Sequence, residues 1–103
     1  MLSIKPNFIC GTPGERLTPD QLSALDAILD EVYEERKKQQ EKWGQQTHSP
    51  ADWYTVLGEE YGEVGHAINE GHTLNYREEL VQTAAVCVAM IDSIDRQIKR
   101  GYL

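Results

Sequence analysis

Three helix start signals divide this chain and constrain its fold more than any other feature. TPDQ at residues 18–21 and SPAD at residues 49–52 each place a hydroxyl side chain at a helix cap and a proline at the first helical position. NYRE at residues 75–78 is typical of a capping box. We therefore expect three helices, the first ending at Gly44 and the last reaching about Lys99.

Apolar residues follow the first signal at helical spacing, which indicates one buried face. They are Leu22, Leu25, Ile28, Leu29, Val32 and Tyr33. Continuing the same stripe brings up Arg36, Gln40 and Trp43, so the buried face becomes polar in its last turns.

The last predicted helix is apolar on more than one face between residues 80 and 94. In a chain of 103 residues this pattern suggests a subunit interface, because a small domain has little core of its own. We expect an all-α helical bundle over residues 19–103, completed by assembly into a homodimer or a tetramer. An extended N-terminal arm is expected at residues 1–18.

Composition excludes several classes of partner. The chain has 17 acidic and 10 basic residues and a formal net charge of −7, which argues against binding to nucleic acid or to an anionic membrane. A phosphorylated substrate stays open, because a bound metal can invert the local charge. The two cysteines have no CxxC spacing, and no apolar run resembles a secretory signal or spans a bilayer. We expect a reduced, cytoplasmic protein.

Acidic and amide side chains recur three residues apart in two of the predicted helices, within GEEYGEV at residues 58–64 and EELVQ at residues 78–82. Glu60 falls inside the apolar arc of its helix, with Glu63 at the edge and Glu59 a step further out. Glu79 and Gln82 share one side of the last helix. A glutamate on an apolar face must be neutral, paired or bound to a metal.

One interpretation is that these acids form buried ion pairs with Arg36, Lys42 or Arg77. The acids outnumber the cations within reach, which favours a divalent metal instead. Mg2+ prefers carboxylate oxygens and also binds phosphates, so this interpretation predicts a phosphorylated substrate.

EExxE at residues 59–63 followed by ExxQ at residues 79–82 resembles the EExxE…ExxD signature of the MazG-like, all-α nucleoside triphosphate pyrophosphohydrolases. The segment at residues 35–48, with KWG at 42–44, and the run at residues 78–86 are similar to small, phage-associated members. The resemblance covers roughly residues 30–95. It implies a MazG-like helical domain that cleaves a nucleoside triphosphate to the monophosphate and pyrophosphate.

The resemblance also implies the roles of particular residues. Mg2+, or Mn2+, would be held by Glu60, Glu63 and Glu79, with Gln82 in the last ligand position. Glu59 would bind a second metal or position the attacking water, so the four glutamates form the expected catalytic set. The expected substrate-binding residues are Arg36, Gln40, Lys42, Trp43 and His48, with Trp43 as a wall for the base.

Gln82 departs from the family pattern, which has aspartate at this position. An amide oxygen can coordinate Mg2+ but carries no charge, so one metal site is expected to be weaker. The substrate could also differ, for example dUTP or a noncanonical or signalling nucleotide. An alternative of another class is a non-catalytic helical dimer that senses nucleotides or binds a protein.

Overall fold

The structure, a computed structural model, describes residues 11–101, and this part of the chain is all-helical. It contains α1 (Pro19–Trp43), α2 (Pro50–Asn69) and α3 (Thr73–Lys99), with no β-strand among the described residues. The all-α class is therefore confirmed. Most of the predicted N-terminal arm, residues 1–10, lies outside the described residues.

The first two helices begin where the sequence predicts. At α1, the Thr18 hydroxyl accepts a hydrogen bond from the Gln21 amide at 3.1 Å, and the Gln21 side chain accepts one from the Thr18 amide at 2.8 Å. At α2, the Ser49 hydroxyl accepts from the Asp52 amide at 3.2 Å. Gly44, with φ of 71°, ends α1, because a positive φ is easily adopted by glycine.

The predicted start of the last helix is wrong by three residues. α3 begins at Thr73, and its cap is His72, whose Nδ1 accepts a hydrogen bond from the Asn75 amide at 3.3 Å. Asn75 therefore lies within the first turn and does not cap it. The imidazole acts here as the acceptor that a serine or aspartate usually supplies, which is why a search for common cap residues overlooks it.

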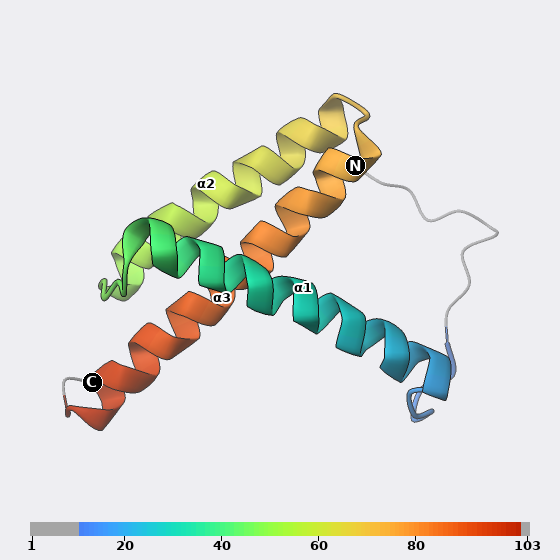
Figure 1. Cartoon of the computed structure of the whole chain (residues 1–103), viewed down its shortest axis with the longest axis horizontal. Coiled ribbons are helices and arrows are strands. Elements are labelled where there is room, and N and C mark those ends of the chain that lie inside the picture. Colours follow the sequence, from blue (N-terminus) through green and yellow to red (C-terminus); the bar gives the residue numbers. More distant parts are fainter. Residues whose placement is uncertain (1–10, 102–103) are drawn as a thin grey trace.

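α3 is the central helix of the fold. α2 packs along α3 as the second arm of a hairpin, and α1 crosses α3 on another side (Figure 1). Among the described residues, α1 and α2 each contact α3 but make no helix–helix contact with each other. The N-terminal half of α1 consequently projects away from the hairpin (Figure 1).

The core of the single chain is small. Its buried apolar residues are Val32, Trp53, Ala67, Ala85 and Val86. The radius of gyration is 16.7 Å, whereas a compact domain of about 100 residues has about 13 Å. None of the three described helices combines the length and the apolar character needed to cross a membrane.

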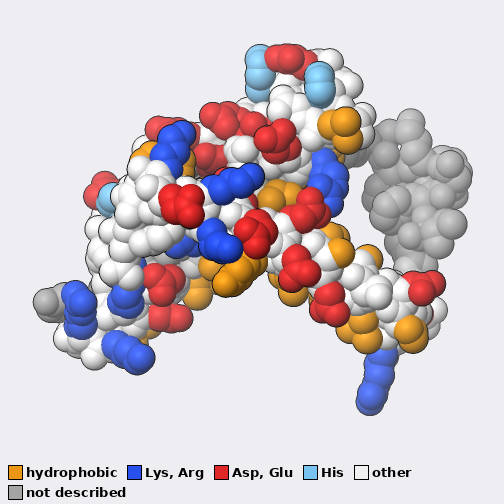
Figure 2. Space-filling view, viewed as in Figure 1, with side chains coloured by type: hydrophobic (Ala, Val, Ile, Leu, Met, Phe, Trp, Pro, Cys, Tyr) orange, Lys and Arg blue, Asp and Glu red, His pale blue; other side chains and the backbone are white. Residues whose placement is uncertain are grey.

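The predicted apolar stripe of α1 is mostly uncovered. Only Val32 of this stripe is buried, and Leu22, Leu25, Ile28, Leu29 and Tyr33 are exposed. Figure 2 shows hydrophobic side chains reaching the surface along α1. The helical spacing of these residues is as expected, but the chain itself does not supply a surface that covers them.

Candidate functional site

Three of the predicted metal ligands lie together. One carboxylate oxygen from each of Glu60, Glu63 and Glu79 falls within 4.8 Å of the others. The three-residue spacing puts Glu60 and Glu63 on one face of α2, and the packing of α2 on α3 brings Glu79 against them. We call these three residues the carboxylate cluster. Exposed acidic groups are common without a metal. Whether this cluster calls for a cation therefore depends on the burial of its carboxylates and on their ion-pair partners.

Two oxygens of the cluster are buried and have no hydrogen-bond partner. They are Oε2 of Glu60 and Oε2 of Glu79. Within residues 11–101, no lysine, arginine or histidine forms an ion pair with any member of the cluster. A buried oxygen without a donor costs free energy, and the cost is larger when the group is charged. The folded protein is therefore destabilised when all three carboxylates are ionised and no cation is bound.

Burial is the main cause that raises the pKa of Glu79 to about 7. A hydrogen bond that protonated Glu79 can donate to Glu63 raises this pKa further, and so does repulsion from Glu63, Glu60 and Glu78. A carboxyl group with such a pKa is partly protonated at neutral pH unless a cation replaces the proton.

The pKa of Glu60 is also raised, first by burial and then by repulsion from Glu63, Glu35 and Glu59. Glu35 comes from α1, so both α1 and α2 contribute negative charge around this carboxyl group. Glu35 was not among the predicted site residues.

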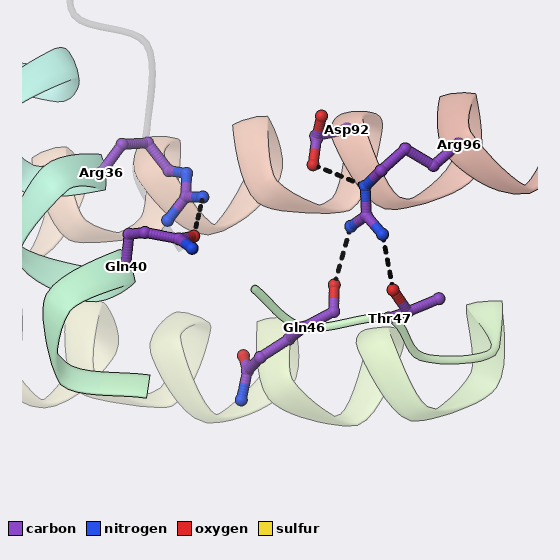
Figure 3. Close-up of polar contacts among 6 residues, drawn as sticks. All are labelled: Arg36, Gln40, Gln46, Thr47, Asp92 and Arg96. Carbon is purple, nitrogen blue, oxygen red and sulfur yellow. Dashed lines mark hydrogen bonds and ion pairs between the residues drawn. The ribbon is translucent and has the colours of Figure 1, made fainter. Parts of the chain in front are cut away.

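The cations considered as ion-pair partners of the cluster contact other groups. Arg77 binds Glu31 on α1, with Nη1 donating to Oε1 at 2.8 Å. The Lys42 ammonium lies 4.7 Å from the centre of the Trp43 ring. Arg36 donates from Nη2 to the Gln40 side chain at 3.4 Å (Figure 3). The described side chains therefore leave the cluster without a basic partner.

A cleft of about 280 Å³ adjoins the cluster. Glu60 is the member of the cluster that lines the cleft, together with Glu59; Glu63 and Glu79 are not among its lining residues. The end of α1, the segment after Gly44, the start of α2 and the second half of α3 form the walls. Its other lining residues are Arg36, Gln39, Trp43, Gly44, Gln45, Gln46, Trp53, Val56, Val86, Ala89, Asp92 and Arg96. The carboxylate cluster and the partly apolar cleft thus meet at Glu60.

The predicted substrate-binding residues divide into two groups. Arg36 and Trp43 line the cleft. Gln40, Lys42 and His48 are not among its lining residues. His48 instead packs edge-on against the Trp53 ring, with 4.8 Å between the ring centres.

The prediction that Gln40 lies on the buried stripe of α1 is wrong. Gln40 is exposed, whereas Gln39 is 8% exposed and donates from Nε2 to the backbone carbonyl of Gln82 at 3.4 Å. The sequence offers Gln39 as well as Gln40 as a polar residue for the pocket, and Gln39 follows the buried Val32 by seven residues, or two helical turns, so the heptad spacing favours it over Gln40. Gln82 itself is half-buried on α3, one turn after Glu79.

Sequence reasoning also missed Arg96 and the residues around it. Arg96 donates from Nε to Asp92 at 3.0 Å, from Nη1 to the Thr47 hydroxyl at 2.6 Å and from Nη2 to the Gln46 carbonyl at 3.0 Å (Figure 3). The four-residue spacing of Asp92 and Arg96 is a detectable helical pair. Their contact with residues 46 and 47 depends on the fold and has no local signal.

Comparison of the chain with protein-family models, with curated proteins and with solved structures found no match. The resemblance of its acidic motifs to the MazG-like signature therefore stays a prediction from the sequence.

Proposed function

We propose that this protein is a metal-dependent nucleotide pyrophosphohydrolase of the MazG-like type, which cleaves a nucleoside triphosphate to the monophosphate and pyrophosphate. The observation that carries the proposal is the pair of buried, unpartnered carboxylate oxygens on Glu60 and Glu79. They belong to a cluster without a basic partner among the described residues, at the end of a cleft. The resemblance of the sequence motifs supports the same conclusion.

The residues fit a hard divalent cation. Glu60, Glu63 and Glu79 would hold Mg2+ or Mn2+, and the side-chain oxygen of Gln82 is the proposed neutral ligand. Carboxylate oxygens are the donors that Mg2+ prefers, and Mg2+ usually keeps positions open for water and phosphate. A bound cation would neutralise the phosphates and lower the pKa of a bound water.

The chain's own residues would bind and orient the nucleotide. Glu59 lies at the end of the cleft beside the cluster, where its carboxylate would position the attacking water or bind a second cation. Arg36 lines the same cleft and would face the phosphates. Trp43 and Trp53 provide apolar walls for the base. The volume of about 280 Å³ is close to the lower limit of roughly 300 Å³ for small-molecule pockets.

A second copy of the chain would cover the exposed stripe of α1. Five large apolar side chains of this stripe are exposed in the single chain, and the radius of gyration of 16.7 Å exceeds that of a compact domain. An apolar helix face of this kind is typical of a surface that is buried by association. The proposed active form is a homodimer or a tetramer.

A non-catalytic nucleotide sensor is the second candidate. Gln82 favours it, because an amide in the last ligand position contributes no charge to the metal site. A nucleotide other than a standard triphosphate, such as dUTP or a signalling nucleotide, would fit the same cleft and metal chemistry.

A panel of nucleotides tested for pyrophosphate release in Mg2+ or Mn2+ distinguishes these candidates. If the protein is an enzyme, the wild type should release pyrophosphate from at least one nucleotide. Glu60→Gln should abolish this activity, while the exposed control Glu41→Gln keeps it. Nucleotide binding without turnover would support the sensor instead. A melting temperature unchanged by metal and by nucleotide would support a protein-interaction module.

A further inference from the structure

Residues 44–49 connect α1 to α2 and supply one wall of the cleft. Gly44, Gln45 and Gln46 line the cleft directly. Gln45 and Thr47 are exposed, and this segment has no helical hydrogen-bonding pattern of its own. Its position must therefore be fixed by contacts with other elements.

Those contacts come from the last turns of α3. Arg96 donates to the Gln46 carbonyl at 3.0 Å and to the Thr47 hydroxyl at 2.6 Å. Gln97 donates from Nε2 to the His48 carbonyl at 3.4 Å. Two neighbouring side chains of α3 thus bind three successive residues of the connecting segment, which are about fifty residues away in the sequence.

Arg96 is also held in place itself. Its Nε donates to Asp92 one turn earlier on α3, and its side chain is only 20% exposed. The guanidinium group thereby engages three acceptors at once, which its planar fork of donors allows and a lysine ammonium matches poorly. Figure 3 shows the group between α3 and the connecting segment.

The other arginine of the cleft has a different environment. Arg36 donates to the side chain of Gln40 at 3.4 Å, a long hydrogen bond between groups one turn apart (Figure 3). Its guanidinium is therefore better placed to turn toward a phosphate. Arg96, already bound to three protein acceptors, is suited to holding the wall.

We propose that Arg96 is a positioning residue, which holds residues 44–49 against α3 so that they form a wall of the nucleotide cleft. The effect of Arg96 on nucleotide binding rests on the proposed function, whereas its effect on the position of residues 44–49 does not. Loss of Arg96 would free the connecting segment while the carboxylate cluster, on other turns of α2 and α3, stays intact.

The test uses the full chain with Arg96→Ala, Arg96→Lys, Thr47→Val and, as the matched control, Arg100→Ala. Arg100 is a basic residue one turn further along α3 and exposed. Limited proteolysis by a broad-specificity protease at residues 44–48 is measured without ligand, and KM and kcat are measured with the nucleotide that the wild type hydrolyses.

Arg96→Ala is expected to speed cleavage at residues 44–48 by about tenfold or more, because hydrogen bonds from a charged group are among the stronger ones and cleavage follows the population of the released segment. KM is expected to rise about tenfold with kcat changed by less than about threefold, since ground-state binding is what the wall contributes. Arg96→Lys should recover part of both effects, Thr47→Val should show a smaller change in the same direction, and Arg100→Ala should show none.

Unchanged cleavage at residues 44–48 in Arg96→Ala would overturn the proposal, and so would faster cleavage with an unchanged KM. If the wild type hydrolyses no nucleotide, the proposed function fails, and the proteolysis measurement alone decides whether Arg96 fixes the wall. Arg96→Lys and Thr47→Val keep the test valid if Arg96→Ala does not fold.

Discussion

Glu60 on α2 and Glu79 on α3 each direct a buried carboxylate oxygen without a hydrogen-bond partner into the same cluster. Burial raises the pKa of both carboxyl groups, repulsion from Glu63 adds to each, and no described basic side chain offsets the charge. The cluster is therefore a local source of instability that a proton or a cation relieves.

The metal-free protein should lose stability as the pH rises from about 5 to about 8. The pKa of Glu79 is raised from 4.5 to about 7, so protonation of the folded state is favoured. Its stabilising effect is fully present below pH 4.5 and is lost as the pH passes through about 7. Glu60 contributes in the same direction. Thermal unfolding in a chelator at several pH values measures this dependence.

Glu79→Gln should flatten that pH dependence and raise the melting temperature of the metal-free protein at pH 8, because the amide cannot ionise. Glu41→Gln is the control: it removes a charge from an exposed position on α1 and should have a much smaller effect. Equal pH profiles for the wild type and Glu79→Gln would contradict the assignment of the raised pKa to Glu79.

Gln82→Asp should strengthen metal binding, because it adds a negative ligand one turn after Glu79. An increase in Mn2+ affinity of about tenfold, equivalent to about 1.4 kcal/mol, is expected by calorimetry. Asn69→Asp adds the same charge at an exposed position and controls for net charge. Unchanged or weaker Mn2+ binding in Gln82→Asp would remove residue 82 from the proposed site.

Gln39→Ala should destabilise the protein by about 1 kcal/mol through loss of the buried hydrogen bond to Gln82. Gln40→Ala, on the exposed side of the same turn, should stay within about 0.5 kcal/mol of the wild type. Urea unfolding of both variants in the absence of metal measures the difference. The opposite order of the two effects would show that the packing of α1 on α3 differs from the arrangement described above.

Leu29→Glu should weaken association, because it puts a charge into the exposed apolar stripe of α1. Sedimentation of the wild type should give a dimer or a tetramer, and the variant should shift toward the monomer. Tyr54→Glu is the control, since Tyr54 is an exposed aromatic residue on α2. A monomeric wild type over the accessible concentration range would refute the proposed assembly.

Local sequence signals predict the helices well, because caps and periodicity act within a few residues. The signals at residues 18–21 and 49–52 both correspond to observed caps. The start of α3 was misplaced because His72 acts as its cap. The position of Glu60 in the apolar arc was also readable, since the arc follows from 3.6 residues per turn.

The remaining features of the site depend on how the helices pack. The rotation of α1 about its own axis decides whether Gln39 or Gln40 faces α3. The sequence does not determine this rotation, because the last turns of α1 are polar on more than one side. The contacts of Arg96 with residues 46 and 47 join segments about fifty residues apart, which no local pattern encodes. The meeting of Glu79 with Glu60 and Glu63 was inferred only by assuming that two acidic helix faces pack together.

Titration of the chelator-treated protein with Mn2+ by calorimetry tests the central claim most directly. Saturable binding is expected in the wild type, with at least about a tenfold loss of affinity in Glu60→Gln and an affinity close to the wild type in Glu41→Gln, which removes an exposed charge on α1. Affinity in the wild type should also increase from pH 6 to pH 8, because the cation must displace the proton of Glu79. Absence of saturable binding in the wild type, or equal binding in Glu60→Gln, would contradict the account.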